Sequence, residues 1–377
     1  MPATLRSNAV SVLDLDYYKL TMLQFIWKHY ADVPVTFRLH SRKQDLADII
    51  APRDLRFELG RKFSRHLDVY EAAWLRDLGV FEDAFIDDLA RMLKDDIERP
   101  VIDNRTRNVY VSGDWFKVSL WETFILSAVS EQYSTAFVHT PDEFRRFHDI
   151  YGIGQSGAKW ADFGTRRRFS ADNHETLISH LAQGGYFHGF IGTSNVHFAN
   201  KYELQPIGTY AHELEMVLRN YHDSEFDTTR DVLTKWQEMY PRELRIALTD
   251  TYSTSKFLED HGRFLLENDW RGVRLDSGNP REMGRYVDEW LVKNCPANLA
   301  PLDVVFSDGL DANTIIDLQN RFGQNNGHPA TFINPLFGWG TGLTNPNSDL
   351  SLVMKAVESN GRDTYKVTDD NTKSIGN

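Results

Sequence analysis

Hydrophobic and polar positions in the second half of the chain repeat as one unit: a short apolar run, a polar or glycine-rich turn, and a stretch with helical periodicity. Three apolar runs end at Asp250, Asp276 and Asp308, and a fourth leads to Gly338. Successive end points are 26, 32 and 30 residues apart, which suits one strand and one helix each. Such units in series predict a parallel sheet, either open or closed into a barrel.

The polar residues at these turns should share one edge of the sheet, because the carboxyl ends of parallel strands lie on the same side. That edge is where α/β folds place their binding and catalytic groups. The predicted strands cover residues 188–192, 244–249, 272–275, 302–306 and 330–333, and the predicted helices start near Ser253, Pro280 and Ala312.

The first third of the chain has a different pattern and predicts a smaller sheet with several helices. A helix should run from Asp16 towards His29, and an alternating strand should follow over residues 34–39. Residues 45–100 are charged and helical. Strands are expected over residues 106–115 and 116–120 with a turn at 112–114, and an amphipathic helix over 121–133.

Composition limits the classes of protein to which the chain can belong. With 377 residues, 41% of them hydrophobic and 25% charged, it can form one large globular domain and a smaller one. A formal net charge of −12 disfavours a broad surface for nucleic acid or anionic membranes. Cys295 is the single cysteine, which excludes an internal disulfide and a cysteine-based zinc cluster. No apolar run reaches the roughly 20 residues of a membrane span and no signal-peptide pattern opens the chain, so we expect a cytoplasmic protein.

His212 is the first candidate for chemistry. It falls at the head of a predicted helix, after a short predicted strand near Pro206. A histidine there can act as a nucleophile or a proton carrier, because its pKa lies near neutrality. A partly buried structural histidine is the alternative interpretation.

A run of three arginines stands within DFGTRRRF at residues 162–169. Arginine matches carboxylate and phosphate in a planar fork, and Phe163 adds an aromatic face, so the run indicates an anion site. An exposed charge run on a helix is the alternative.

The acids and glycines at the predicted strand ends suit phosphate and sugar groups. Asp276 and Asp308 could bind a diol or a metal–phosphate group, because carboxylates accept two hydroxyl hydrogen bonds or coordinate Mg²⁺. The glycine-rich stretch at residues 337–342 could bring backbone N–H groups close to a phosphate. Turn formation alone would also explain both acids.

Taken in order, these motifs resemble those of bacterial nicotinate phosphoribosyltransferases over nearly the whole chain. Each motif is weak alone, and the ordered set is specific. The resemblance rests on DYYK at 16–19, DFGTRRRF at 162–169, GTSN at 192–195, GTYAHE at 208–213, ALTD at 247–250, RLDSG at 274–278, FSD at 306–308 and FGWGT at 337–341. Similar proteins continue past KVTDD at 366–370 into a final helix, whereas this chain ends at Asn377.

The resemblance implies the α/β fold of type II phosphoribosyltransferases. This fold is an irregular, TIM-like α/β barrel with a smaller α/β domain built from both chain ends. We expect residues 1–130 and 346–377 to form the smaller domain and residues 131–345 to form the barrel. Such proteins are often homodimers with sites near the subunit interface.

The implied reaction joins nicotinate and 5-phosphoribosyl 1-pyrophosphate to give nicotinate mononucleotide and pyrophosphate. ATP is a co-substrate whose hydrolysis is coupled through a phosphohistidine. By resemblance His212 is the phosphorylated residue, and Asp250 could orient its other ring nitrogen. Mg²⁺ should travel with the phosphates and be held by few protein ligands, so no dedicated metal site is expected.

The resemblance also assigns the residues around the pyridine ring. Phe163 should stack on the ring, and Tyr18 from the neighbouring subunit should cover it. Arg166, with Arg168 as a second candidate, should pair with the anionic groups. Ser194 should donate a hydrogen bond to the carboxylate of nicotinate.

A further set should hold the sugar and the phosphates. Arg274 and Asp276 should bind the ribose and phosphates, and the 5′-phosphate should be cradled by Asp308, Gly309, Gly340 and Thr341. Additional candidates for pyrophosphate or ATP contacts are Arg38, Arg42, Lys355 and Lys366.

Several alternatives stay open. A nicotinamide-using relative of the same fold differs in one substrate group. A quinolinate-using relative would leave the phosphohistidine motif without a role. A non-catalytic binding protein on this barrel would not need both His212 and the acids at the strand ends. A barrel aldolase is disfavoured, because no lysine lies at a predicted strand end.

Overall fold

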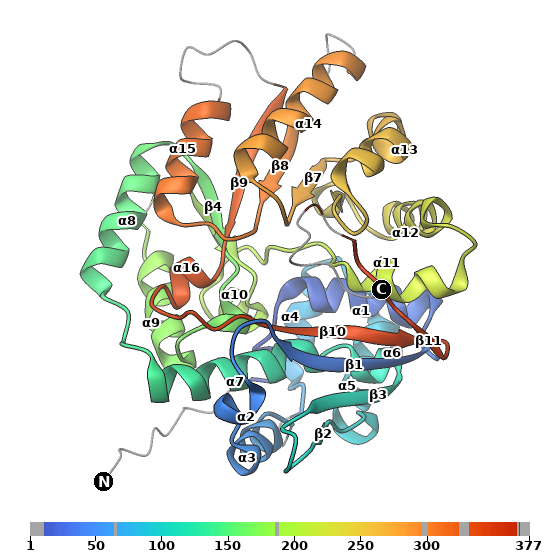
Figure 1. Cartoon of the computed structure of the whole chain (residues 1–377), viewed down its shortest axis with the longest axis vertical. Coiled ribbons are helices and arrows are strands. Elements are labelled where there is room, and N and C mark those ends of the chain that lie inside the picture. Colours follow the sequence, from blue (N-terminus) through green and yellow to red (C-terminus); the bar gives the residue numbers. More distant parts are fainter. Residues whose placement is uncertain are drawn as a thin grey trace.

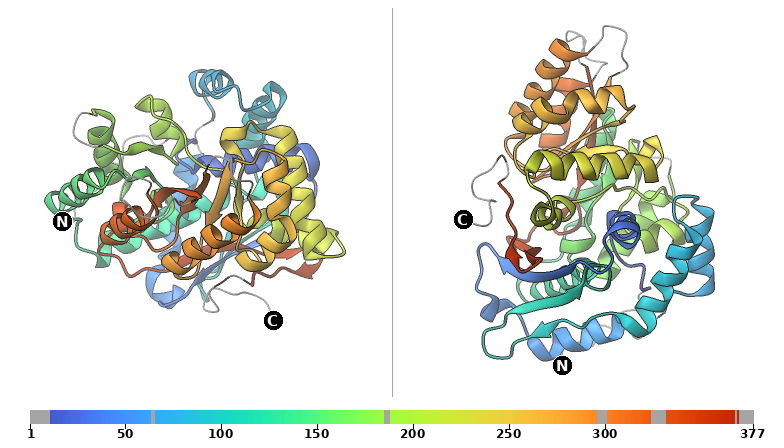
Figure 2. Two further views of the ribbon diagram at one scale, coloured as in Figure 1. Left: turned by 90° about the horizontal axis from the view of Figure 1, so that it is seen from above. Right: turned by 90° about the vertical axis from the view of Figure 1, so that its right-hand side faces the viewer.

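Two sheets organise the protein. The computed structural model describes residues 11–63, 66–184, 188–295, 301–323, 332–367 and 369. A parallel sheet of order β5-β4-β9-β8-β7-β6 occupies the upper half of Figure 1, and an antiparallel sheet of order β11-β10-β1-β3-β2 lies below it. Figure 2 shows the same two layers from the side. The predicted α/β class is confirmed.

The parallel sheet comes from the second half of the chain, as the apolar runs predict. Two of its strands have the predicted bounds, and a third is shortened because residues 242–244 form a 3₁₀ turn. Its strands are β4 (Lys159–Asp162), β5 (Phe190–Thr193), β6 (Ile246–Leu248), β7 (Gly272–Leu275), β8 (Leu302–Phe306) and β9 (Ile333–Trp339). Its helices are α8 (Glu143–Gln155), α9 (Ala171–Ala182), α10 (Val196–Lys201), α11 (Glu213–Leu218), α12 (Glu225–Met239), α13 (Thr254–Glu267), α14 (Pro280–Asn294), α15 (Ala312–Phe322) and α16 (Thr341–Thr344).

Side-chain caps fix where the helices of the repeated units begin. Ser253, Asn279 and Asp311 each accept a hydrogen bond from a backbone N–H in the first turn of the following helix. Such caps satisfy donors that the helix itself leaves unpaired. Pro280 occupies the first helical position, where its missing N–H costs nothing. Each strand is therefore followed promptly by its helix, and the polar turn stays at the sheet edge.

The glycine-rich stretch differs from the prediction. Residues 330–331 of the expected strand lie outside the described residues, and the strand β9 continues through Trp339. Gly338 is therefore a strand residue, and a Cβ added there would lie 2.4 Å from the ring of Phe163. Close packing of that ring on the strand explains this glycine, whereas Gly340 starts the turn beyond the strand.

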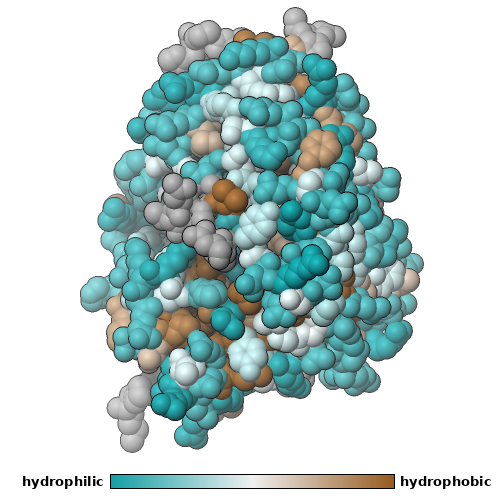
Figure 3. All heavy atoms as spheres, turned by 45° about the vertical axis from the view of Figure 1, so that its right-hand side comes forward, coloured by the Kyte–Doolittle hydropathy of each residue, from teal (hydrophilic) through white to brown (hydrophobic). Residues whose placement is uncertain are grey.

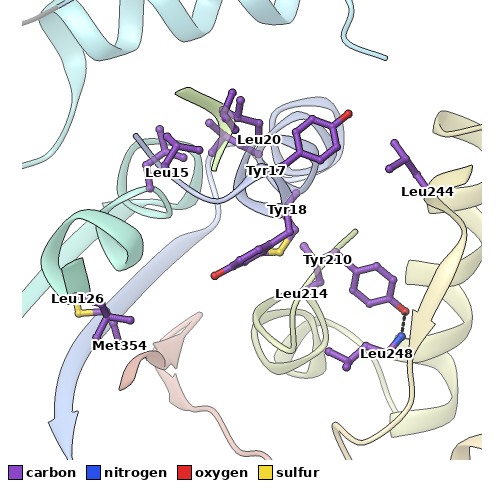
Figure 4. Packing of buried hydrophobic residues seen from close by; sticks show 14 of the residues in the cluster. Leu15, Tyr17, Tyr18, Leu20, Leu126, Tyr210, Leu214, Leu244, Leu248 and Met354 are labelled. Atoms are coloured by element: carbon purple, nitrogen blue, oxygen red, sulfur yellow. Dashed lines mark hydrogen bonds between the residues drawn. The ribbon is translucent and has the colours of Figure 1, made fainter. Parts of the chain in front are cut away.

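An irregular segment spans the two edges of the parallel sheet. Thr193 at the end of β5 forms a parallel bridge with Pro206, and the N–H of Leu248 in β6 donates to Tyr210 Oη at 3.1 Å (Figure 4). The predicted strand at Pro206 is thus a single bridge. Within the described ranges no ladder pairs β5 with β6 directly.

Both ends of the chain contribute to the antiparallel sheet. β1 pairs with β10 from Val35 opposite Ser359 to Ser41 opposite Leu352. Its strands are β1 (Pro34–Ser41), β2 (Val101–Ile102), β3 (Val109–Asp114), β10 (Leu352–Ser359) and β11 (Arg362–Asp363). The helices of this half are α1 (Tyr17–His29), α2 (Leu46–Ile49), α3 (Pro52–Phe63), α4 (Val69–Asp77), α5 (Asp83–Arg91), α6 (Trp115–Val118) and α7 (Trp121–Phe137), with a π-turn η1 (Met92–Asp96) after α5. The division at residues 130 and 346 stays a prediction.

Three expectations for this half need correction. Residues 115–118 form helix α6 instead of a strand, and 112–114 belong to β3 instead of a turn. The aromatic and β-branched composition favours a strand, whereas the structure forms a helical turn here in which Trp115 and Phe116 are buried. Helix α7 is not amphipathic at its start, since every residue from Trp121 to Ser130 is buried.

The outer surface agrees with a chain of mixed polar composition. The face drawn in Figure 3 is mostly hydrophilic, with apolar residues in small groups. In the described part of the chain, no helix has the length and apolar character needed to cross a membrane.

A buried ion pair ties the segment before α1 to the rest of the protein. The guanidinium of Arg168 is fully buried and donates to both carboxylate oxygens of Asp14 at 2.6 Å, and its Nε donates to Glu131 at 2.9 Å. Asn195 donates to the same Asp14 at 2.8 Å. Breaking one partner of such a pair leaves an uncompensated buried charge.

We therefore expect Arg168→Leu to lower the free energy of unfolding by about 3–5 kcal/mol. Arg281→Leu is the matched control, because Arg281 forms a half-exposed pair with Asp317 and should cost only about 0–1 kcal/mol. Urea denaturation of the two variants and the wild type measures both values. Equal losses in the two variants would contradict a special role for the buried pair.

Candidate functional site

A cavity of about 610 Å³ lies between the carboxyl ends of the parallel strands and the antiparallel sheet. Its wall contains residues that the sequence analysis predicted for the site and others that it did not. The predicted residues that line it are Tyr18, Phe163, Arg166, Ser194, His212, Arg274, Asp276, Asp308, Gly309, Gly340 and Thr341, together with the further candidates Arg42, Lys355 and Lys366. Arg168, Asp250 and Arg38 are not among its lining residues.

His212 occupies the N-cap position of α11, at the head of the helix as the pattern predicts, without a capping hydrogen bond from its side chain. Its Nε2 lies 3.3 Å from Asp276 Oδ2 and 3.6 Å from Asp250 Oδ1, and its Nδ1 lies 3.0 Å from Thr251 Oγ1. Asp250 therefore lies on the Nε2 side of the ring, and its expected role in orienting the imidazole stays a prediction. Thr251 lies on the opposite side, because the turn after β6 brings its hydroxyl to Nδ1.

Lys366 completes the surroundings of the imidazole. Its ammonium lies 2.6 Å from His212 Nε2 and 3.4 Å from Asp250 Oδ2. The backbone N–H of Val367 donates to Thr251 O at 3.0 Å, which holds this C-terminal segment over the end of β6. Burial and the positive charge of Lys366 lower the pKa of His212, and the nearby carboxylates of Asp250 and Asp276 oppose that shift. The neutral imidazole, the nucleophilic form, is thereby favoured.

Asp276 and Asp250 have different surroundings. Asp276 accepts from Ser307 Oγ at 2.8 Å and lines the cavity. Burial would raise its pKa, but the hydrogen bond with His212 and the charge of Arg274 hold the pKa well below its usual range. Asp250 is fully buried behind the cavity and accepts from Ser277 Oγ at 2.5 Å. Asp276 is thus part of the cavity wall, whereas Asp250 lies behind it in contact with His212 and Lys366.

The three consecutive arginines have separate surroundings. Arg166 pairs with Asp16 and Glu122, at 3.1 Å each, and its guanidinium lies over the ring of Tyr18. Arg168 is fully buried and does not line the cavity. The expectation that Arg168 contacts the substrate is therefore not met. Arg167 faces the cavity, and no carboxylate of the described residues forms an ion pair with it. Burial and the charges of Arg166 and Arg42 lower the pKa of Arg167 to about 10, so an anion would relieve this repulsion.

Two aromatic side chains flank this charge. Phe163 packs on Gly338 and also faces the cavity. Tyr17 and Tyr18 point to different sides of α1 in Figure 4. Tyr18 is 6% exposed, and its Oη has no hydrogen-bond partner among the described residues. It lines the cavity of its own chain, so it needs no neighbouring subunit to reach this site.

Ser194 lines the cavity but its hydroxyl is already engaged. It is 3% exposed and donates to Asp16 Oδ1 at 2.7 Å. Burial raises the pKa of Asp16, and the charge of Arg166 and the bond from Ser194 oppose that shift. The expected donation from Ser194 to a substrate carboxylate would require this bond to break, because a hydroxyl has one proton to donate.

The remaining predicted residues also line the cavity. Gly309 has φ of 60°, a left-handed conformation that suits glycine in the turn after β8. Gly340 and Thr341 begin α16, and Asp308 lies beside them on the cavity wall. Arg274 Nε is buried without a hydrogen-bond partner in the described part of the chain, so a donor is available there.

A metal cage is not evident in the described ranges. No group of three or more His, Cys, Asp and Glu side chains there is placed to hold a metal ion. Asp276 and Asp308 line the cavity as separate carboxylates. Such an arrangement fits a cation that is bound mainly by phosphate oxygens.

Sequence reasoning missed two residues of this site. Thr251 directly follows a predicted strand-end acid, and that position was the available signal. Arg167 stands in the middle of the recognised arginine run, but no sequence pattern says which of three adjacent arginines faces a cavity.

Fold and site together define an α/β protein whose polar cavity, with a histidine and several arginines, lies at the carboxyl ends of a parallel sheet. Comparison with models of known protein families identifies the family within this class. Residues 158–377 match the model of the nicotinate phosphoribosyltransferase (NAPRTase) family, and residues 13–130 match the model of the NAPRTase N-terminal domain. The chain belongs to the nicotinate phosphoribosyltransferase family.

Individual relatives agree with that assignment. The chain is 32% identical to nicotinate phosphoribosyltransferases of Enterobacter sp. (strain 638) and Escherichia coli (strain SMS-3-5 / SECEC), over 97% of this chain and 92% of each relative. The crystal structure of nicotinate phosphoribosyltransferase from Vibrio cholerae superimposes with a TM-score of 0.83 at 28% identity, covering 98% of this chain and 91% of that one. The enzyme from Porphyromonas gingivalis gives a TM-score of 0.82 at 26% identity, over 97% and 96% of the two chains.

The charge of Lys366 should be measurable at His212. We expect His212 to titrate below 6.5, and Lys366→Met to raise its pKa, because a neighbouring cation disfavours the protonated ring. An NMR titration of the His212 ring checks the shift. Lys28→Met, which removes a half-exposed lysine paired with Glu82, should leave the His212 pKa unchanged. A pKa that stays the same or falls in Lys366→Met would contradict the geometry.

Proposed function

We propose that this protein is an ATP-coupled nicotinate phosphoribosyltransferase. It joins nicotinate and 5-phosphoribosyl 1-pyrophosphate to nicotinate mononucleotide and pyrophosphate, with hydrolysis of ATP to ADP and phosphate, in NAD salvage. The observation that carries the proposal is the single cavity that unites His212, the ring of Phe163, the guanidinium of Arg167 and the carboxylate of Asp276. Membership of the family supports the same assignment.

His212 is the residue that we propose to be phosphorylated by ATP. Its lowered pKa keeps the imidazole neutral and nucleophilic near pH 7. Lys366, 2.6 Å from Nε2, supplies positive charge where a transferred phosphoryl group would arrive. Arg42 and Lys355 line the same cavity and are candidates for further phosphate contacts.

The sugar phosphate is assigned to the strand ends on the other side of His212. Asp276 would accept hydrogen bonds from ribose hydroxyls, and the unpartnered Nε of Arg274 would donate to a phosphate. Asp308, Gly309, Gly340 and Thr341 would surround the 5′-phosphate. Mg²⁺ bound to these phosphates would neutralise their charge, and Asp276 and Asp308 are the side chains that would contact it.

The pyridine ring is assigned to the space beside Phe163 and Tyr18. Arg167 would pair with the carboxylate of nicotinate, because no ion pair within the described residues neutralises its charge. Arg166 would contribute less, since Asp16 and Glu122 already match it. A cationic wall favours nicotinate over the neutral nicotinamide, which is the second candidate substrate.

The proposal extends to architecture. The bridging segment from Pro206 to Tyr210 supports an irregular barrel, with a smaller domain from residues 1–130 and 346–377. A homodimer and a cytoplasmic location are further parts of the proposal that follow the resemblance.

A product assay tests the function. The purified protein should form nicotinate mononucleotide from nicotinate and 5-phosphoribosyl 1-pyrophosphate, faster with ATP than without it. Nicotinamide should be a poor substrate, because Arg167 would face an uncharged amide. Formation of nicotinamide mononucleotide at a comparable rate would overturn the substrate assignment, and no nucleotide product at all would favour a binding protein.

His212→Asn tests the coupling. An amide cannot carry an N-linked phosphate, so the variant should retain no labelled phosphate from ATP. Slow transfer without ATP should persist, because the proposed ribose and phosphate groups lie on other strand ends. Asn keeps a polar side chain of similar size, and circular dichroism checks the fold. Full stimulation by ATP in this variant would remove His212 from the mechanism.

A further inference from the structure

Asp162 ends β4 directly before Phe163, and its side chain lies behind the cavity wall. Asp162 is fully buried and does not line the cavity, whereas Phe163 does. A buried carboxylate needs hydrogen-bond donors, because burial without them carries a large desolvation cost. The donors of Asp162 come from three segments of the chain, so its carboxylate joins these segments to the turn that carries Phe163.

Each donor to Asp162 holds the carboxylate from a different direction along the chain. The backbone N–H of Gly164 donates to Oδ1 at 2.8 Å within the turn itself. Thr193 Oγ1, at the end of β5, donates to Oδ2 at 2.6 Å. His174 Nε2, on α9, lies 2.8 Å from the same oxygen. Burial would raise the pKa of Asp162, but these three interactions hold it below its usual value, so the ionised carboxylate accepts and Nε2 donates.

His174 has no direct access to a ligand in the cavity. Its side chain is fully buried, it does not line the cavity, and its Nδ1 has no hydrogen-bond partner among the described residues. The ring packs edge-on against Phe198, with centroids 4.9 Å apart. The hydrogen bond to Asp162 is thus the route by which His174 can influence the cavity.

The same hydrogen bonds reach the turn after β5. Thr193 Oγ1 accepts from the backbone N–H of Asn195 at 3.0 Å, and Asn195 Nδ2 donates to Thr165 Oγ1 at 3.3 Å. Thr165 begins the 3₁₀ turn that carries Arg166 and Arg167. The turns after β4 and β5 are therefore tied together behind the wall that faces the proposed position of the pyridine ring.

We propose that Asp162 is a positioning residue for the binding of the pyridine ring, and that His174 and Thr193 keep its carboxylate in place. The inference rests on the proposed function, in which Phe163 and Arg167 bind nicotinate. None of the three positioning residues lines the cavity, so they act through the turn that follows β4.

The packing of Phe163 makes its position sensitive to this turn. Its ring packs on β9 so closely that a Cβ added at Gly338 would lie 2.4 Å from the ring. Loss of a donor to Asp162 should shift the turn, and the ring moves with it. Asp276 and Asp308 should keep their positions, because they follow β7 and β8, and β9 separates those strands from β4.

Kinetics with two substrates separates positioning from a general loss of structure. In His174→Leu the KM for nicotinate should rise by at least about tenfold, because misplacing a binding group by about 1 Å can cost that much or more. The KM for 5-phosphoribosyl 1-pyrophosphate should stay close to the wild-type value. His174→Gln, whose amide N–H can replace the donor at Nε2, should restore most of the affinity for nicotinate.

A second buried histidine provides the matched control. His261 is also buried and does not line the cavity. His261→Leu should leave the KM for nicotinate unchanged, whatever it does to the free energy of unfolding. Should His174→Leu fail to fold, Thr193→Val carries the same expectation, because it removes another donor to Asp162 with nearly the same shape.

The position of the ring can also be observed without turnover. In full-length protein labelled with fluorophenylalanine, the Phe163 signal is the one that disappears in Phe163→Leu. The ¹⁹F NMR shift of this signal in the ligand-free protein should differ between His174→Leu and the wild type. His174→Gln should bring it back towards the wild-type value, and His261→Leu should not move it.

Any of three results would overturn the inference: an unchanged KM for nicotinate in the variants that lose a donor, an equal rise in both KM values, or a Phe163 signal that does not move. The proposed function fails differently. In that case the wild type forms no nucleotide, although the Phe163 signal still responds to loss of the His174 donor.

Discussion

Buried charges have to be paired, and one paired cluster borders the cavity, which Glu122 and Glu213 line. Lys19 is fully buried on α1 between Glu122 of α7, at 2.6 Å, and Glu213 of α11. Trp115 Nε1 donates to the same Glu213 at 2.7 Å. Removing one partner of such a cluster would leave an uncompensated charge at a cost of about 3–5 kcal/mol. Because Glu213 directly follows His212, the cluster also fixes the position of the candidate nucleophile.

The same cluster joins the two sheets into one site. Glu122 pairs onward with Arg166 of the 3₁₀ turn after β4, and Arg166 pairs with Asp16 at the start of α1. Asp16 in turn accepts from Ser194 at the end of β5. Neither sheet supplies a complete cavity, since the strand ends form one wall and β1 and β10 with α1 form the other. These ion pairs therefore help to hold the two walls of the cavity together.

The sequence predicts the parts of this arrangement that are governed by local rules. Apolar runs give β7 and β8 their bounds, and capping residues such as Asn279 give the helix starts. Parallel order then brings Asp276 and Asp308 to one edge. The conformation of residues 115–118 and the partner of Ser194 could not be predicted in this way, because both depend on contacts between segments far apart in the chain. The side of His212 on which Asp250 lies has the same origin.

The arginine run shows how far a motif alone can lead. Residues Thr165–Arg167 form a 3₁₀ turn, in which successive side chains point about 120° apart, and Arg168 follows in an extended conformation. The three arginine side chains therefore have three different environments. Arg166 pairs with carboxylates at the cavity wall, Arg167 faces the cavity, and Arg168 pairs with the buried Asp14. The motif indicates cationic side chains at a cavity, but backbone geometry decides which guanidinium faces the cavity without a carboxylate partner among the described residues.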